Sequence, residues 1–558
     1  MPKQQADLLL AVAYQPCKVL EQSPAEGASE LASKQGSVLW RNLLAGLSLA
    51  NLCFFPLWSA ILPQNGKWLY LAELPPARVV YAAAVMAVTV VGVVCGVGIH
   101  WIETSTDARR RTVGIVVLSV FSLVLANAVR TAAAEQLPFL RLGGLLAMLK
   151  TSRHALEIAA VAGVGMGFVL VWAGHRARQR LLAAGKCALL ALFPFFALSV
   201  SWAGWRITTY DPSSFLAKPD SVRNCSNLRA GKRVVWVVFD EWDERLTALA
   251  GKDLRNILEF RSEAVCSAAA YPPGADTLRS MAGLITGQVV SEVDVEGPDR
   301  LWLTLSDGTR SRLGSKPTVF SRSSEIGAGS ALVGWTLPYS RLFAGQLCSC
   351  WWAGFPQRWN AVKGGFWEVF AWHIRSLFET GSASPFGEPV MVRRHLWIYQ
   401  QILERGKRAA LDPGVGLALL HFSVPHLPAI YRADTGRLGR NLSTPGGYLD
   451  NLKLVDRTVG DLRAAMEAAG LWDSTTVLLT SDHWFRGAEA LDGKVDHRVP
   501  FLLKLAGQRK GMVYDKPFNT VLTHDLILAI LSGELKTPDQ VAAWLDSQRI
   551  RPEGQYRP

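Results

Sequence analysis

Residues Thr475–His483, TTVLLTSDH, contain an apolar run that ends abruptly in a carboxylate and an imidazole. The run is short and begins with β-branched residues, so it predicts a buried strand rather than a helix. Asp482 and His483 then lie at the carboxyl end of that strand, where open α/β sheets usually carry their chemistry. Aspartate and neutral histidine are both good ligands for a divalent metal. A hydrogen-bonded turn is the alternative interpretation of this pair taken alone.

A second apolar run carries acids at its end. Val234–Phe239, VVWVVF, is followed directly by Asp240 and Glu241. Two adjacent buried carboxylates repel each other unless a positive charge lies between or beside them. A metal ion supplies that charge most simply, and a salt bridge to Arg245 or Lys232 is the alternative. Together the two strands predict a metal site at one edge of a sheet.

A hydroxyl group stands at the expected start of a helix. Pro272, Pro273 and Gly274 force a loop, Thr277 follows it, and Leu278–Ile285 has the pattern of a helix. A hydroxyl in this place ordinarily caps the helix. It is also a suitable place for a nucleophile, because the free N–H groups and the helix dipole favour a bound anion.

Three histidines accompany two further strand-like runs. Gly416–His426, GLALLHFSVPH, contains His421 and ends in His426, and His497 precedes the short run Val499–Leu503. His421 closes a buried strand, which favours a structural role, with substrate contact as the alternative. Arg486, three residues after the Asp-His pair, is a candidate for binding a phosphate, since guanidinium groups match phosphate geometry.

In this order the segments resemble the alkaline phosphatase superfamily, and most closely its sulfatase-like membrane transferases, which include phosphoethanolamine and phosphoglycerol transferases. The resemblance covers roughly Lys232–Ser532 and implies an α/β domain with a mixed, mostly parallel sheet. The motifs that carry it are Asp240-Glu241, Thr277–Gly287 (TLRSMAGLITG), His426-Leu427-Pro428, Tyr448–Leu462 and Ser481-Asp482-His483.

The resemblance also implies roles for these residues. One divalent metal, Zn²⁺ or Mn²⁺ in the first place and Ca²⁺ or Mg²⁺ as alternatives, is expected on ligands drawn from Asp240, Glu241, Asp482, His483 and the nucleophile Thr277. Transferases typically have one acid at the first strand end and sulfatases have two, so both Asp240 and Glu241 stay candidates. His426 and His497 are expected to stabilise the phosphate or protonate the leaving oxygen, or else to hold a second metal.

The nucleophile position separates two chemistries. Sulfatases oxidise a Cys or Ser to formylglycine, and a threonine cannot give that aldehyde. Thr277 therefore favours transfer of a phospho group, with sulfatase-like ester hydrolysis as an alternative. Because a free threonine hydroxyl is nearly unreactive at neutral pH, metal coordination is what would activate it.

The first third of the chain is strongly apolar. Each of five segments has close to the roughly 20 apolar residues that cross a bilayer. These segments are Leu43–Leu62, Val79–Ile102, Thr112–Ala134, Ala155–Trp172 and Leu181–Trp202. We therefore expect a cytoplasmic tail (1–37), a transmembrane helical bundle of about five spans (38–205), a polar linker (206–230) and a catalytic domain (231–558).

Basic loops give the orientation. Arg109–Arg111 lie between the second and third expected spans, and Arg176, Arg178, Arg180 and Lys186 surround the turn between the fourth and fifth. The positive-inside rule makes both loops cytoplasmic. The catalytic domain is then expected to be periplasmic, on a bacterial-type inner membrane.

The composition bears on partners. The formal charge of +13 accompanies no nucleic-acid recognition motif, and cytoplasmic loops plus a domain facing anionic head groups account for much of it. We expect a phospholipid or lipid-linked donor and a periplasmic acceptor, and no nucleic acid. Two alternatives stay open: a phosphodiesterase or phosphatase that releases its product to water, and a lipid-binding regulator built on a degenerate site.

Overall fold

The computed structural model describes residues 24–62, 78–136, 180, 182–209, 231–297, 299–354, 365–378, 390–439, 441 and 446–548. The chain forms two compact units. One contains residues 24–55, 88–129, 180 and 182–200. The other contains residues 56–62, 78–87 and 130–136 and everything described from residue 201 onward.

A nine-stranded sheet forms the centre of the C-terminal domain, with the order β13-β2-β12-β11-β1-β8-β6-β7 and β14 paired to β2. The neighbours β11, β1, β8, β6 and β7 are all parallel, and β12 runs antiparallel to both β11 and β2. The sheet is therefore mixed and mostly parallel, as predicted. The strands are β1 (Arg233–Asp240), β2 (Val265–Tyr271), β6 (Ser330–Thr336), β7 (Ser349–Gly354), β8 (Leu417–Pro425), β11 (Thr475–Ser481), β12 (Val499–Lys504), β13 (Met512–Val513) and β14 (Phe518–Asn519).

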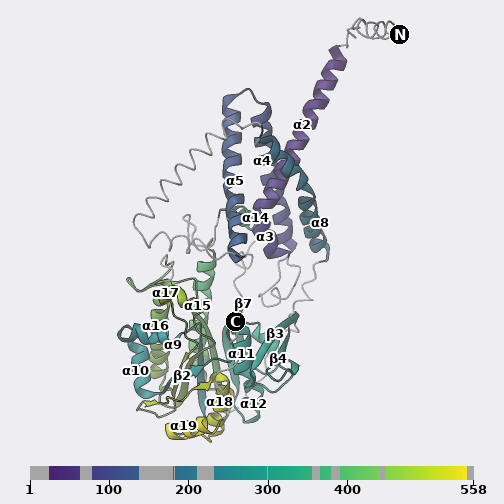
Figure 1. Cartoon of the computed structure of the whole chain (residues 1–558). Helices are drawn as coiled ribbons and strands as arrows, with labels where there is room; N and C mark the ends of the chain where they lie inside the picture. The colour runs from purple at the N-terminus through teal and green to yellow at the C-terminus, as the bar shows by residue number, and fades with distance from the viewer. Residues whose placement is uncertain are drawn as a thin grey trace, which may run out of the picture. The chain divides into compact units, whose positions relative to one another are not determined.

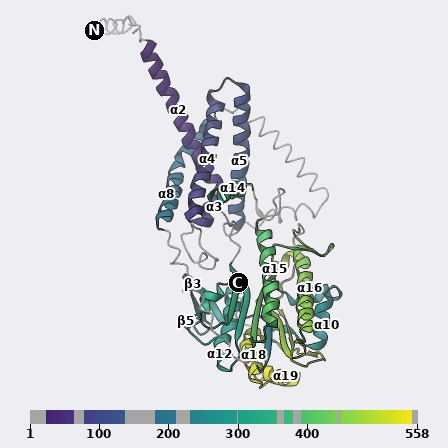
Figure 2. The same cartoon turned by 180° about the vertical axis from the view of Figure 1, so that it is seen from behind.

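Helices cover both faces of this sheet (Figures 1 and 2). On one face lie α11 (Thr277–Thr286), α12 (Val319–Glu325), α13 (Tyr339–Leu342), α18 (Thr523–Ser532) and α19 (Pro538–Ser547). On the other lie α9 (Glu244–Ala250), α10 (Arg255–Glu263), α15 (Val390–Leu411) and α16 (Gly446–Ala468). The smaller elements are β3 (Val290–Gly297), β4 (Arg300–Leu305) and β5 (Arg310–Arg312), which form a separate antiparallel sheet, the hairpin β9 (Tyr431–Arg432) and β10 (Arg437–Leu438), α14 (Phe366–Ser376) and α17 (Glu489–Asp492).

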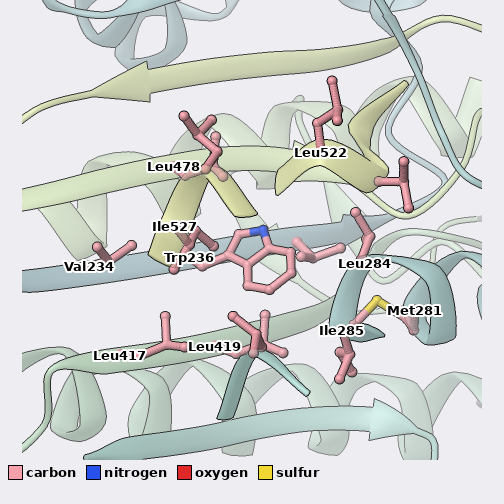
Figure 3. Packing of buried hydrophobic residues seen from close by; sticks show 14 of the residues in the cluster. Val234, Trp236, Met281, Leu284, Ile285, Leu417, Leu419, Leu478, Leu522 and Ile527 are labelled. Atoms are coloured by element: carbon pink, nitrogen blue, oxygen red, sulfur yellow. The ribbon is translucent and has the colours of Figure 1, made fainter. Parts of the chain in front are cut away.

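The double covering explains why β1 is apolar throughout. Alternate residues point to opposite faces, so Val234, Trp236 and Val238 enter one core while the residues between them enter the other. Figure 3 shows Trp236 at the centre of the first core, among side chains of β11, α11 and α18. A strand buried on both faces favours apolar residues along its length, as Val234–Phe239 of β1 show.

The apolar N-terminal third is helical where the structure describes it. The helices are α2 (Pro24–Cys53), α3 (Phe55–Ile61), α4 (Arg78–Thr104), α5 (Ala108–Gln136) and a helical stretch Leu182–Thr209 that includes α8 (Phe193–Thr209). Among the described residues, three helices are long and apolar enough to cross a membrane: Arg78–Thr104, Ala108–Val129 and Leu182–Thr209.

The prediction of about five spans is therefore not confirmed. The expected first span, Leu43–Leu62, is divided between α2 and α3 by a turn at Phe54, just before Pro56. Proline lacks the N–H that would continue the helix ladder. The expected fourth span, Ala155–Trp172, lies outside the described residues, as does most of the expected linker, whose residues 206–209 continue α8.

Glycines allow α2 and α4 to approach each other closely. A Cβ atom at Gly46 of α2 would overlap backbone atoms of both Gly92 and Gly96, which are spaced four residues apart on α4. Small residues at this spacing are typical of tightly packed membrane helices, where association depends on close van der Waals contact. The N-terminal unit is therefore held by backbone-to-backbone packing that tolerates no side chain.

We expect Gly46→Ala to destabilise the helical unit by about 1–3 kcal/mol, because the added methyl forces two backbones apart. Thermal unfolding of the full chain in detergent would measure the effect. Gly36→Ala is the matched control, since Gly36 lies on the same helix with nothing within 4 Å of its Cβ position. Equal unfolding temperatures for the two variants would contradict this packing.

Candidate active site

The site forms where β1 and β11 end side by side. The strands pair in parallel with Phe239 opposite Ser481, so Asp240 and Asp482 follow at the same edge of the sheet. Ser481 secures this junction: its Oγ lies 2.7 Å from the Phe239 carbonyl oxygen and accepts the Trp242 N–H at 2.8 Å. Two segments some 240 positions apart in the chain thus deliver their acids to one point.

Three potential metal ligands meet there. Ligand atoms of Asp240, Asp482 and His483 all lie within 4.8 Å of one another, and all three residues are buried. His483 Nε2 is 3.6 Å from Asp240 Oδ1 and 3.5 Å from Asp482 Oδ2. Neither of these carboxylate oxygens has a hydrogen-bond partner within the described part of the chain. Since buried polar oxygens rarely stay unpaired, their chemistry and arrangement fit a divalent cation.

The charges of the two aspartates differ. Burial raises the pKa of Asp240 well above its usual value, and the neighbouring Asp482 and Glu241 raise it further. Burial also opposes ionisation of Asp482, but the adjacent His483 and His421 and the Glu241 N–H bring its pKa below the usual value. The pair therefore holds one firm negative charge on Asp482 and a second carboxyl that needs a cation to ionise.

The imidazole of His483 is oriented by the backbone. Its Nδ1 lies 2.9 Å from the Trp484 carbonyl oxygen, which can only accept a hydrogen bond. Nδ1 therefore carries the proton, and the Nε2 lone pair faces the two aspartates. A backbone carbonyl that fixes the tautomer in this way is typical of metal-binding histidines.

Glu241 lies beside the three ligands, and its carboxylate points elsewhere. The Glu241 carboxylate accepts the Arg486 Nε–H at 3.0 Å. Its backbone is left-handed, with φ of 64°, and is fixed by two bonds: its N–H donates to Asp482 Oδ1 and its carbonyl accepts the Tyr448 hydroxyl at 2.7 Å. Such strain in a residue other than glycine persists only where the surroundings enforce it, often at functional sites. Arg486 supplies the positive charge beside the two acids, rather than the Arg245 or Lys232 considered above.

Thr277 is the first residue of α11, and its hydroxyl is not the helix cap. Asp276 holds the cap position and accepts the Arg279 N–H at 3.0 Å. The Thr277 Oγ1 lies instead 3.4 Å from His483 Nε2. The hydroxyl is thereby directed at the three metal-ligand candidates, at the helix end where anions are favoured.

The three sequence-selected histidines take different positions. His426 lines the cleft described below, and its backbone N–H donates to the Asp240 backbone carbonyl oxygen at 3.1 Å. His421 is fully buried, with Nδ1 2.8 Å from the Tyr339 hydroxyl, and burial lowers its pKa to about 4. His497 stacks on Trp484 at 4.2 Å between ring centroids and is not among the residues that line the cleft.

A cleft of about 710 Å³ opens onto this edge of the sheet. Arg279 and Arg486 line it and are ion-paired, at 2.6 Å to Asp276 and at 3.0 Å to Glu241. Glu292 and Asp294 of β3 form an acidic wall, in which Asp294 lies 3.5 Å from the Arg310 guanidinium. Sequence reasoning missed that wall, since β3 belongs to a small separate sheet whose short alternating pattern carries no chemical signature. The lining residues are Asp240, Asp276, Thr277, Leu278, Arg279, Ser291, Glu292, Val293, Asp294, Thr304, Trp335, Thr336, His426 and Arg486.

One buried acid near the site makes stability depend on pH. Asp243 caps α9 by accepting the Leu246 N–H at 2.9 Å, and burial raises its pKa to about 6 from 3.8. Between these values the folded state retains a proton that the unfolded chain releases, so stability falls as pH rises from about 4 to about 6. The cost above that window is at most about 3 kcal/mol.

We expect Asp243→Asn to be more stable than the wild type at pH 7 and to lose this advantage at pH 4. Asparagine caps helices about as well as aspartate and carries no charge to bury. Thermal unfolding of both proteins at the two pH values measures the difference, because the other titrating groups are common to both. An advantage of the same size at both pH values would exclude Asp243 as its source.

The sequence family described as Type I phosphodiesterase / nucleotide pyrophosphatase matches residues 308–525, a range that contains His426, Asp482 and His483 but not Asp240 or Thr277. An ulvan-active sulfatase of Formosa agariphila is 27% identical over 166 residues, covering 24% of this chain and 32% of that protein. The chain thus matches about a third of the length of this curated relative.

Solved structures also match. A protein of the alkaline phosphatase superfamily from Vibrio parahaemolyticus is 14% identical, with 58% of this chain and 71% of that chain covered and a TM-score of 0.36. The lipoteichoic acid synthase LtaP from Listeria monocytogenes is 14% identical, with 57% and 78% covered and a TM-score of 0.36.

Proposed function

We propose that this chain is a membrane-bound metal-dependent enzyme that transfers or hydrolyses phosphate esters through Thr277. Its resemblance to the alkaline phosphatase superfamily is confirmed by these matches. Cleavage or transfer of a phosphate or sulfate ester is the activity common to the relatives. The observation that carries the finer proposal is the Thr277 hydroxyl placed 3.4 Å from His483 Nε2, beside two buried aspartate oxygens that have no hydrogen-bond partner among the described residues.

The proposed metal would be held by Asp240, Asp482 and His483, with Thr277 as a fourth ligand. When bound, a divalent ion such as Zn²⁺ or Mn²⁺ lowers the pKa of a coordinated hydroxyl and neutralises charge on the phosphoryl group. The mixture of carboxylates and one imidazole suits these metals, and leaves Mg²⁺ and Ca²⁺ as alternatives. Glu241 is assigned a supporting role, since its carboxylate pairs with Arg486.

Each residue of the site is then assigned one role in the reaction. The Thr277 hydroxyl releases its proton to solvent and its oxygen attacks phosphorus, while the bond from phosphorus to the leaving oxygen breaks, giving a phosphothreonine. Arg486 and Arg279, which line the cleft, are positioned to bind the non-bridging oxygens. His426 lines the same cleft and is the group we assign to protonate the leaving oxygen. An acceptor hydroxyl or water then takes the phospho group from Thr277.

Phosphate rather than sulfate is the proposed centre of reaction. A threonine cannot form the formylglycine aldehyde on which sulfatases depend, so a threonine nucleophile is proposed to take up a phospho group. Glu292, which lines the cleft, adds a preference for a substrate that carries a positively charged group next to its phosphate. We therefore propose a phospholipid or lipid-linked donor with an amine-bearing head group, and an acceptor outside the membrane.

Mass spectrometry of Thr277 tests this function. The full chain, purified in detergent with Mn²⁺ or Zn²⁺, is incubated with phosphatidylethanolamine in the absence of any acceptor. A covalent phospho adduct on Thr277 that disappears when an acceptor is added supports the proposal. Turnover of the donor with no adduct at Thr277, under conditions that stop the reaction within one turnover, would exclude this residue as nucleophile.

The three candidate spans support a protein embedded in a membrane. We propose that this is the inner membrane and that the catalytic domain lies on its periplasmic side. A reporter fused after Gly231 is then expected to be active outside the cytoplasm, and one fused after Arg111 inside it, because the basic residues 109–111 at the start of α5 stay with the cytoplasmic leaflet. Paired alkaline phosphatase and fluorescent-protein fusions measure this. A Gly231 fusion that reports the cytoplasm would exclude a periplasmic donor site.

A further inference from the structure

α14 (Phe366–Ser376, FWEVFAWHIRS) is an aromatic helix that the catalytic chemistry does not use. In sequence it lies between the edge strand β7 and α15, which packs against β8 and β6. At 100° per residue, its side chains fall into three faces: one buried, one exposed and apolar, and one narrow and charged. Each face has its own surroundings.

The buried face attaches α14 to the start of a candidate membrane span. Val369, Trp372 and His373 are buried on this side. The His373 Nε2–H donates to the Val80 carbonyl oxygen over 3.1 Å. Val80 is the third residue of α4, which is 27 residues long and apolar enough to cross a bilayer. The first turn of a span lies at the level of the lipid head groups, so this bond places α14 at the same level.

The exposed apolar face follows a strict helical spacing. Trp367, Ala371, Ile374 and Phe378 recur at intervals of four, three and four residues, and therefore lie in one row. Trp367 is 66% exposed and Phe378 is 44% exposed. Large aromatic side chains gathered in one exposed row mark a surface that another apolar phase covers.

The charged face is narrow. Glu368 and Arg375 stand seven residues apart, so they lie one above the other beside the apolar row, and both are exposed. A helix with an aromatic face, a charged strip and a position at the membrane surface has the pattern of helices that lie in the bilayer interface. Tryptophan in particular is enriched at that depth.

We propose that α14 is a membrane-interface helix, with the Trp367 row immersed in the outer region of the bilayer and the Glu368–Arg375 strip in the aqueous head-group layer. Because α14 follows β7 and precedes α15 in the chain, it couples the sheet of the catalytic domain to the lipid surface. The inference rests on the membrane spans and on the surface of α14, so it stands independently of the proposed phospho transfer.

An environment-sensitive fluorescent amino acid introduced at Trp367 or Glu368 tests this in the full chain, reconstituted in phosphatidylcholine–phosphatidylglycerol nanodiscs. The two positions are neighbours in sequence, both are exposed, and they lie about 100° apart around the helix, so each controls for the other. The probe at 367 is expected to lose most of its emission to lipids spin-labelled near the head group and to resist aqueous iodide, with the reverse pattern at 368. Similar quenching by iodide at both positions would overturn the proposal.

Shielding of the 367 probe from both lipid and iodide would equally overturn it, since a protein partner would then cover this face. If the Trp367 probe variant fails to insert, the probe at Ile374 in the same row takes its place. As a second readout, Trp367→Glu is expected to slow turnover of a donor lipid held in nanodiscs while turnover of a short-chain soluble donor stays unchanged. Glu368→Gln is the matched control, with both activities at wild-type level.

Discussion

Thr277→Ala is expected to lower kcat by at least about 10³-fold while the protein stays folded and inserted, because the only atom removed with chemical function is the attacking oxygen. The fold is spared because the start of α11 is capped by Asp276, not by Thr277. Turnover of a defined phospholipid donor by the purified full chain measures the loss. Metal content, measured in the same samples, shows whether the site remains assembled.

Thr277→Ser is the matched variant. It retains the hydroxyl but loses the methyl group that restricts the side-chain rotamer, so it should keep a measurable fraction of the activity. Alanine and serine variants with equal residual activity would remove the hydroxyl from the mechanism. An alanine variant with wild-type turnover would exclude Thr277 as the nucleophile.

Asp482→Asn and His483→Ala should each remove the bound metal and lower activity by more than about 100-fold. Substituting even a residue that only hydrogen-bonds to a metal ligand commonly lowers metal affinity or activity by about 10- to 100-fold. Asp482 also fixes the backbone of the neighbouring strand end by accepting the Glu241 N–H at 3.1 Å. Asparagine retains an oxygen for that bond, which keeps the fold comparable. Elemental analysis of the purified variants gives the metal stoichiometry.

Glu241→Gln is the control that separates the two acids of β1. The carboxylate of Glu241 pairs with Arg486 and an amide oxygen can still accept that bond, so this variant should retain its metal if Asp240 is the ligand. Loss of metal from Glu241→Gln, with retention in Asp240→Asn, would reverse the assignment. If the Thr277, Asp482 and His483 variants each complement a deletion strain fully, the protein acts as a regulator by binding alone and the proposed enzyme activity is wrong.

The strands of the site could be predicted because burial leaves a strong trace in sequence. β1 is apolar from Val234 to Phe239 and β11 is apolar at its centre, Val477–Leu479, since each is covered on both faces, and the acids that follow them are conspicuous against that background. Their direct pairing could not be deduced from periodicity, since the two strands lie more than 230 residues apart. The resemblance to a known superfamily, through the order of the motifs, is what placed Asp240 and Asp482 together.

The choice between Asp240 and Glu241 depends on a backbone angle that no local pattern specifies. Glu241 turns left-handed immediately after β1, which directs its carboxylate to Arg486. Glycine or asparagine would have indicated that turn in the sequence, whereas glutamate does not. The acidic wall on β3 escaped prediction for a similar reason, since Glu292 and Asp294 come to the cleft only through tertiary packing of a separate sheet.

The membrane spans show where hydropathy alone is insufficient. It found α4, α5 and the helix ending at Thr209, but it merged α2 and α3 into one span across Phe54. The mean hydropathy of a sequence window depends on the summed apolarity of its residues. A single missing backbone hydrogen bond in the helix hardly changes it. Pro56 was visible in the sequence, and its missing N–H is the signal that would have separated the two helices.

The capping of α11 by Asp276 has a consequence for how this site can change. Catalytic positions often limit thermal stability, since the group best suited to the reaction is poorly suited to the fold. Here the residue that caps the helix, Asp276, and the proposed nucleophile, Thr277, are neighbours with separate tasks. Serine, cysteine or alanine can therefore stand at position 277 with little change in the free energy of unfolding. The chemistry of the site is free to drift over generations, or to be redesigned, without a compensating substitution elsewhere.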